Sequence, residues 1–139
     1  MKKQLFLLLL ALLFPAFVSY TWFILTTGHH NYTQDNTFSF WLYTPATLKK
    51  LPFISNNNVY SYDYNPDNQQ TRVIITWTDI NNILEKKQDL IAFLEMLEGL
   101  NKYDCSWLYN DKNDFSDNYQ RYCIFQKEKT LELEFFETW

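Results

Sequence analysis

The hydrophobic pattern divides the chain into one long apolar run and a mixed remainder. Residues 5–27 form an uncharged run of 23 residues. At about 1.5 Å of rise per residue, a helix of this length spans roughly 34 Å, enough for a hydrocarbon core of about 30 Å. We therefore predict that residues 1–27 are a single transmembrane helix that is kept as a signal-anchor. A cleaved secretory signal is the alternative, but the small-x-small cleavage sites after Phe14 are poor.

Basic residues set the expected orientation of this helix. Lys2 and Lys3 precede the run, and the next basic residue beyond it is Lys49. Positive residues favour the cytoplasmic side, so we expect a cytoplasmic N-terminus too short for a domain and residues 28–139 on the other side. The richness in Asn, Lys, Tyr, Phe and Ile is typical of an AT-rich bacterial genome. The membrane would then be the bacterial inner membrane, and residues 28–139 would be periplasmic.

The polar and apolar positions that follow predict one small domain over residues 38–139. Residues 28–37 are polar and are expected to be a linker. Apolar positions alternate within residues 37–43, which predicts a strand. A helix of about two turns is expected to begin at Pro45 and to end before Pro52.

The middle of the chain predicts a hairpin and a long helix. Residues 59–64 and 70–78 read as two strands joined by a type I turn around Pro66. Residues 79–98 carry apolar side chains at the i, i+3, i+4 and i+7 positions of one helix face, and Gly99 ends that helix. We expect the apolar face to lie across the sheet, with a partner helix as the alternative.

Three more strands are predicted at residues 103–109, 119–126 and 130–137. Helices interleaved with runs of strands indicate an α+β fold with an antiparallel sheet and one main helix. The order of the first six elements matches a ferredoxin-like arrangement. A strongly curved sheet or a partial barrel is the alternative.

Composition excludes several functions. Residues 28–139 contain 10 Lys and Arg against 16 Asp and Glu, a net charge of −6 that argues against binding of nucleic acid. Glycine occurs only at positions 28 and 99, so there is no glycine-rich phosphate loop, dinucleotide fingerprint or nucleophile elbow. We therefore expect a protein that is not an enzyme and that has no catalytic residues and no cofactor.

The two cysteines predict a disulfide. If residues 103–126 form a hairpin centred on Asp114, Cys105 and Cys123 lie opposite each other. Disulfides persist outside the cytoplasm, which agrees with the expected location. Two reduced, buried thiols are the alternative.

No metal site is expected. His29 and His30 are adjacent in an extended segment, so their side chains point in opposite directions. The acidic stretch that contains Asp111, Asn113, Asp114 and Asp117 fails the EF-hand pattern and reads as a solvated hairpin tip. Glu132 and Glu134 alternate with leucines, so we expect them on the solvent-exposed face of a strand. We do not expect them to form an acid–base pair.

Aromatic residues are dense beyond the apolar run, with 8 Phe, 9 Tyr and 4 Trp in residues 28–139. Most of them suit a β-rich core. Some are also candidates for exposed anchors at a partner surface. The candidate partner-binding residues are Trp41, Tyr60, Tyr62 and Tyr64.

In its layout the chain resembles ToxS-like proteins, including those of the VtrC and PsaF type. The resemblance rests on the basic start Met1-Lys2-Lys3, the single span over residues 5–27 and a β-rich domain of similar size. It implies a periplasmic partner of a ToxR-like, membrane-bound transcription activator, which it stabilises as a heterodimer. It also implies an apolar ligand such as a bile acid.

Two functions are therefore expected. The first is an accessory or sensory subunit of a membrane-bound transcription regulator. The second is a periplasmic immunity or exclusion protein that neutralises a toxin or an injected factor, whose basic surface an acidic domain would complement. An accessory subunit should require its own span, whereas an immunity protein should work with residues 28–139 alone.

Overall fold

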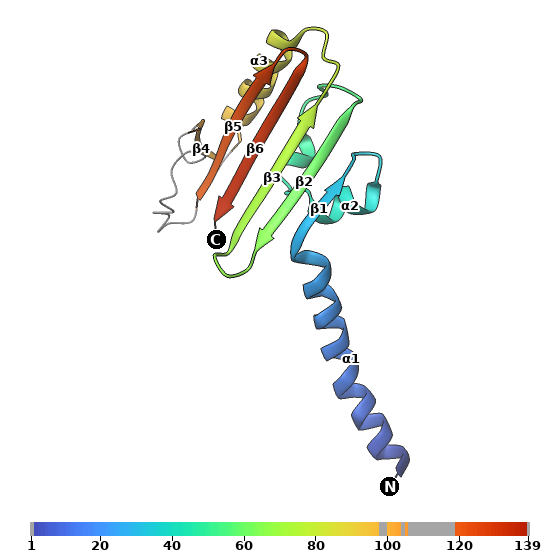
Figure 1. Ribbon diagram of the computed structural model, residues 1–139. Helices are drawn as coiled ribbons and strands as arrows, with labels where there is room; N and C mark the ends of the chain where they lie inside the picture. The colour runs from blue at the N-terminus through green and yellow to red at the C-terminus, as the bar shows by residue number, and fades with distance from the viewer. Residues whose placement is uncertain (1, 98–99, 104, 106–118, 139) are drawn as a thin grey trace.

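A long helix joined to one end of a sheet domain makes up the protein (Figure 1). The computed structural model describes residues 2–97, 100–103, 105 and 119–138. Helix α1 (Lys2–Thr26) extends away from the domain. It is the one helix in the described part of the chain that is long and apolar enough to cross a membrane, and no part of its Leu9–Thr26 window is buried. A membrane anchor and a secretory signal share these properties, so both expectations for this segment agree with the structure.

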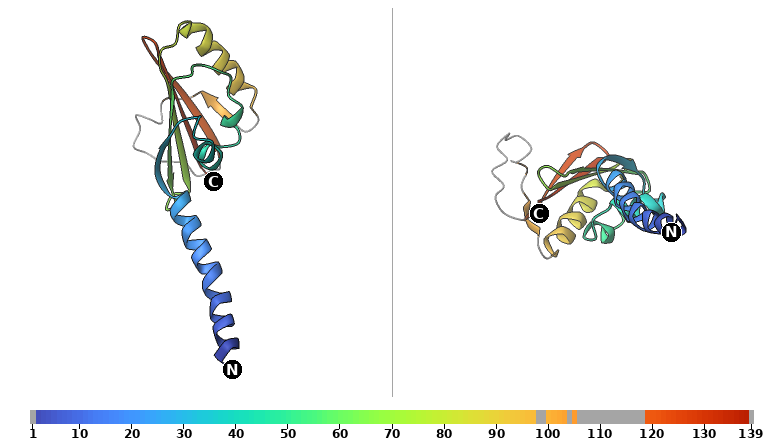
Figure 2. Two further views of the ribbon diagram at one scale, coloured as in Figure 1. Left: turned by 90° about the vertical axis from the view of Figure 1, so that its right-hand side faces the viewer. Right: turned by 90° about the horizontal axis from the view of Figure 1, so that it is seen from below.

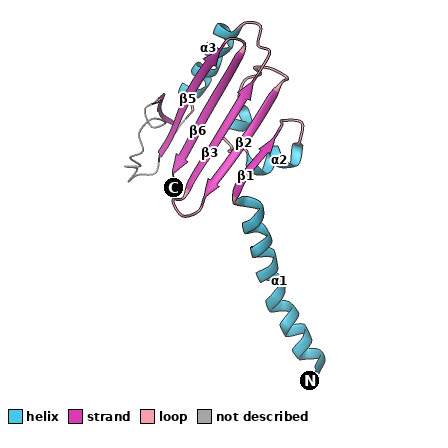
Figure 3. Cartoon of the chain, viewed as in Figure 1, coloured by secondary structure: helices cyan, strands magenta, loops and turns pink. Residues whose placement is uncertain are grey.

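One six-stranded sheet with the strand order β1-β2-β3-β6-β5-β4 forms the domain (Figure 3). Its strands are β1 (Gly28–Tyr32), β2 (Asn58–Asn65), β3 (Gln70–Trp77), β4 (Leu100–Tyr103), β5 (Tyr119–Lys127) and β6 (Thr130–Thr138). Neighbouring strands are antiparallel except β4 and β5, which run parallel. The α+β fold class is thus confirmed. In the described residues β1 and β4 are two separate edges, so the sheet is open and is neither a barrel nor the ferredoxin-like arrangement.

The helical elements of the domain lie on one face of the sheet, which we call the inner face (Figure 2). They are α2 (Thr37–Tyr43), the 3-10 turn η1 (Leu48–Lys50) and α3 (Ile83–Glu95). The strand register places four core side chains in a row across the sheet: Tyr60, Ile75, Leu133 and Ile124. Each is at most 3% exposed, and Leu90 and Leu94 of α3 are fully buried. Burial of each such side chain stabilises the fold by about 1.5–3 kcal/mol.

The opposite, outer face carries an ion pair between a buried carboxylate and an exposed arginine. Glu134 is only 3% exposed, and Arg72 of the neighbouring strand β3 forms a salt bridge with it. Cys123 of β5 lies directly across from Glu134. The prediction that Glu134 is on a wet face is therefore wrong, because the ion pair allows its charge to be buried. Glu132 is half-buried and accepts a hydrogen bond from Thr76 Oγ1 at 3.2 Å.

Between the long helix and the hairpin, the structure differs from the sequence prediction. Residues 37–43 form helix α2 and not a strand. The side chain of Asn36 caps this helix by accepting a hydrogen bond from Ser39 N at 3.2 Å. The spacing of Phe40 and Tyr43 then directs both toward the sheet, where they contact core tyrosines. The helix expected after Pro45 is reduced to the single turn η1.

The hairpin of β2 and β3 is confirmed with nearly the predicted bounds. Helix α3 is also confirmed, but it begins at Ile83 and not at residue 79. Asp79 has a φ of 57°, and Ile80 N donates a hydrogen bond to Lys129 O at 3.0 Å. This bond fixes the chain against the β5–β6 turn, and the helix starts only after it.

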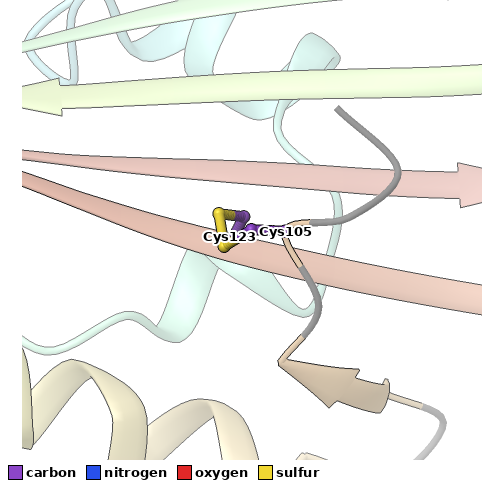
Figure 4. The surroundings of a disulfide bond; sticks show 2 residues. All are labelled: Cys105 and Cys123. Atoms are coloured by element: carbon purple, nitrogen blue, oxygen red, sulfur yellow. A yellow bond between two sulfur atoms is a disulfide. The ribbon is translucent and has the colours of Figure 1, made fainter. Parts of the chain in front are cut away.

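The Cys105–Cys123 disulfide is confirmed, with the two Cα atoms 5.1 Å apart (Figure 4). The predicted antiparallel hairpin over residues 103–126 is not found at its start, because Tyr103 ends β4, which runs parallel to β5. Most of the strand expected at residues 103–109 lies outside the described residues, and so does the acidic stretch from Asp111 to Asp117. The disulfide fixes Cys105 against the outer face of β5.

We expect loss of this disulfide to lower the stability of the domain. It closes a loop with a sequence separation of 18, so Cys105→Ser should lower the free energy of unfolding by about 3 kcal/mol. Urea unfolding of the full chain in detergent, without reductant, measures the change. The double variant with Cys123→Ser should lose little more, because one bond is lost in both. Free thiols that react in the untreated native protein would contradict the assignment.

Candidate functional site: the junction between helix α1 and the sheet

Helix α1 passes into the sheet without a linker. The helix ends at Thr26, and β1 begins at Gly28, which is paired with Tyr64 of β2. Gly28 has a φ of 90°, in the left-handed region that glycine adopts at low cost and that commonly ends helices. The sequence prediction of a linker over residues 28–37 is therefore wrong. Its first half is an edge strand that fixes the direction in which α1 leaves the domain.

Side chains of the sheet bind the last carbonyl groups of α1. His30 Nε2 donates a hydrogen bond to Thr27 O at 3.1 Å. Tyr62 Oη donates one to Thr26 O at 3.5 Å. The final carbonyl groups of a helix have no partner within the helix. These two bonds therefore join the end of α1 to β1 and β2.

Six ring side chains, which we call the junction cluster, pack around these bonds: His30, Tyr32, Phe40, Tyr43, Tyr60 and Tyr62. His30 stacks on Tyr43 with ring centroids 4.1 Å apart, and Tyr43 lies 5.3 Å from Tyr62. Phe40 meets Tyr60 edge to face at 5.5 Å. Such pairs add about 0.5–1.5 kcal/mol each beyond the burial of area. The cluster thus holds α2, β1 and β2 together beside the end of α1.

The tyrosine hydroxyls of the cluster have a structural role. Tyr32 Oη and Thr44 Oγ1 are 2.9 Å apart and share a buried hydrogen bond. Burial raises the pKa of Tyr32 and of Tyr60 to about 12. Both hydroxyls are therefore neutral at physiological pH, and neither is poised for acid–base chemistry.

The four predicted partner-binding residues occupy different environments. Tyr60 is 3% exposed and belongs to the core, so it cannot contact a partner in this state. Tyr62 and Tyr64 share the inner face of β2 with Tyr60 and are half-buried. Trp41 lies on α2 and is 62% exposed, which makes it the one member of the set that is open to a partner.

Sequence reasoning missed the roles of His30 and Tyr43. His29 and His30 do project from opposite faces of β1, as predicted, but His30 enters the junction cluster. The alternation of His30 and Tyr32 after Gly28 was the available signal. The sequence pattern predicts a strand at Tyr43, and a strand there does not suggest contact with His30.

A buried carboxyl group lies level with the point where α1 leaves the sheet. The register connects Gly28 to Tyr64, Thr71, Glu137 and Gln120 in one row across five strands. Glu137 is 8% exposed and accepts a hydrogen bond from Gln120 Nε2, whereas the buried Gln120 Oε1 has no partner among the described residues. Burial raises the pKa of the Glu137 carboxyl above its ordinary value of 4.5.

Three depressions among the described residues differ in size and lining. A cavity of about 90 Å³ lies between the α2–η1 segment and the sheet, and is lined by Phe40, Leu48, Tyr60 and Trp77 among others. Pockets for drug-sized ligands are about 300–1,000 Å³, so this one is too small for a molecule the size of a bile acid. Two larger depressions, of about 310 and 590 Å³, are lined mainly by polar side chains. No group of three or more His, Cys, Asp or Glu side chains placed to hold a metal occurs among the described residues.

Comparison with known proteins identifies no relative. No protein-family model, curated protein or solved structure matches the chain. The similarity to ToxS-like proteins therefore stays one of layout. What the site can do follows from its geometry, which joins an apolar helix rigidly to a folded sheet.

Substitution of the buried carboxyl should change how stability depends on pH. Because folding raises the pKa of Glu137, the native state binds this proton more tightly than the unfolded chain. The contribution of this protonated carboxyl to the free energy of unfolding is fully present below pH 4.5. It is lost as the pH rises through the higher pKa of the native state. Glu137→Gln keeps an acceptor for Gln120 and carries no charge. The variant should be more stable than the parent at neutral pH and should depend less on pH.

Urea unfolding at neutral and at mildly acidic pH tests this expectation. Glu95→Gln, at an exposed position near the end of α3, is the matched control and should leave the pH profile unchanged. A Glu137→Gln variant that is less stable than the parent at neutral pH would contradict the proposed effect of burial.

Proposed function

We propose that the protein is a membrane-anchored accessory subunit that acts through a protein partner and performs no catalysis. In this proposal α1 spans the bacterial inner membrane with its N-terminus in the cytoplasm, and residues 28–139 fold in the periplasm. The partner is a membrane-bound transcription regulator of the ToxR-like kind. The observation that carries the proposal is the direct junction of α1 and β1, which the hydrogen bonds of His30 and Tyr62 brace and which we take to be rigid.

A rigid junction affects function only if the partner must meet the domain at a defined position relative to the membrane. With β1 starting two residues after the end of α1, any tilt or rotation of the helix moves the whole sheet. A partner held beside α1 in the same membrane would then meet the domain in one orientation. A protein that only captures a soluble toxin gains nothing from such a junction, because a flexible tether would present its surface equally well.

Two further observations support this placement. The Cys105–Cys123 disulfide agrees with an oxidising compartment such as the periplasm. The net charge of −6 in residues 28–139 favours a partner with a basic surface. The exposed Trp41 is a candidate anchor for such a contact.

Crosslinking in native membranes, followed by purification of the full chain, tests for the partner. We expect a membrane protein with a cytoplasmic DNA-binding domain to be recovered. Recovery of a secreted toxin or an injected factor would replace the proposal with the immunity function. Recovery of the chain alone or only with itself would also contradict it.

The junction itself can be tested by making it flexible. Insertion of Gly-Ser-Gly between Thr27 and Gly28 should leave the fold and the anchor intact but should abolish the effect on the partner regulator. The same insertion between Asp67 and Asn68, in the β2–β3 turn, is the control and should retain the effect. Replacement of residues 5–27 by an unrelated span should also impair function. Full activity of both altered proteins would contradict an accessory role that depends on α1.

A further inference from the structure

Helix α2 presents two large aromatic side chains to the outside. Phe38 is 61% exposed and Trp41 is 62% exposed, and their spacing places them on the same side of the helix. Phe40 and Tyr43 occupy the other side and contact the sheet. Both exposed rings are thus fixed on a helix that cannot turn them inward.

This helix packs beside β1, the strand that follows α1 directly, at the level of His30 and Tyr32. Tyr43, its last residue, stacks on His30, which is bonded to Thr27 O at the end of α1. Figures 1 and 2 agree that α2 lies beside β1, close to the point where α1 leaves the domain. If α1 spans a membrane, the C-terminal end of α2 is the part of this helix nearest to the surface of that membrane.

The charge around α2 differs from that of the rest of the domain. Residues 36–53 contain Lys49 and Lys50 and no acidic residue, and the exposed Asp35 lies directly before them, whereas residues 28–139 carry a net charge of −6. Lys49 Nζ donates a hydrogen bond to Trp41 O at 2.7 Å and lies 5.8 Å from the centroid of the Trp41 ring. Both lysines are exposed. A cation is therefore held beside an exposed tryptophan in an otherwise acidic domain.

We infer that α2 docks on the lipid surface beside α1, with Trp41 and Phe38 among the lipid headgroups and Lys49 and Lys50 against anionic ones. Tryptophan favours the interface between membrane and water. Lysine stems can lie along apolar surface while their amines reach charged headgroups. With Asp35 as the one acidic residue within residues 35–53, this segment would meet less repulsion at an anionic surface than the rest of the domain.

The inference rests on the membrane anchor of the proposed function and adds a second point of attachment. A single helix holds the domain at the membrane but leaves it free to tilt with respect to the surface. Contact of α2 with the same membrane would limit that tilt. The domain would then meet a neighbouring membrane protein at a constant height and inclination.

Quenching of tryptophan fluorescence by brominated lipid tests the docking and the anchor separately. The full chain is placed in nanodiscs that contain phosphatidylglycerol, with bromine near the headgroup end of the acyl chains. The decrease in quenching from the parent chain to Trp41→Phe reports on α2, and the decrease from the parent to Trp22→Phe reports on α1. We expect both decreases to be substantial. High salt should reduce only the part due to Trp41.

The charge contribution has a matched control. Lys49→Gln and Lys50→Gln should each weaken the docked state about fivefold and reduce the quenching of Trp41. Lys127→Gln with Lys129→Gln, at the far end of β5 and β6, should leave it unchanged.

The outcomes separate the two claims. Quenching of Trp22 without quenching of Trp41 would overturn the docking while the anchor stands, and would make a protein the occupant of the exposed face of α2. Quenching of neither would overturn the anchor, and with it the proposed function. Quenching of Trp41 that the Lys49 and Lys50 substitutions do not reduce would overturn the role of the lysines.

Discussion

Pairing of β1 with β2 directly after α1 is the constraint on which the rest of the structure depends. It leaves Gly28 alone to turn the chain from helix to strand and sets the direction of α1. It brings His30 to the last carbonyl groups of the helix and under the ring of Tyr43. Without this pairing, α2 would have no partner on β1, and the helix and the sheet would move independently.

The two faces of the sheet are stabilised by different interactions. On the inner face, apolar side chains such as Ile75 and Leu133 are buried beneath α3, and aromatic rings fill the end nearest α1. On the outer face, burial of Glu134 depends on its ion pair with Arg72, next to the disulfide of Cys123. Both faces of the sheet are therefore held by contacts between residues far apart in the sequence.

Sequence patterns predicted the features that depend on local or strongly periodic signals. The apolar helix, the β2–β3 hairpin, α3 and the disulfide were found in this way, and the α+β class follows from them. The prediction of a strand over residues 37–43 is wrong. Alternating aromatic residues suit a strand, but the Asn36 cap and the tertiary contacts of Tyr43 favour a helix. The sequence of β1 is polar and shows no strand pattern, because this strand is stabilised by its pairing with β2. The burial of Glu134 and of Glu137 depends on partners far away in the chain.

Amide hydrogen exchange over residues 28–36 of the full chain, in nanodiscs, tests the rigid junction most directly. If β1 is a strand of the sheet, its bonded amides should be protected to a similar degree as those of the β2–β3 hairpin. Slow exchange would show that β1 stays paired with β2 up to the end of α1, as the rigid junction requires. Fast exchange throughout, as in a solvated linker, would contradict the rigid junction and remove the main support for an accessory role.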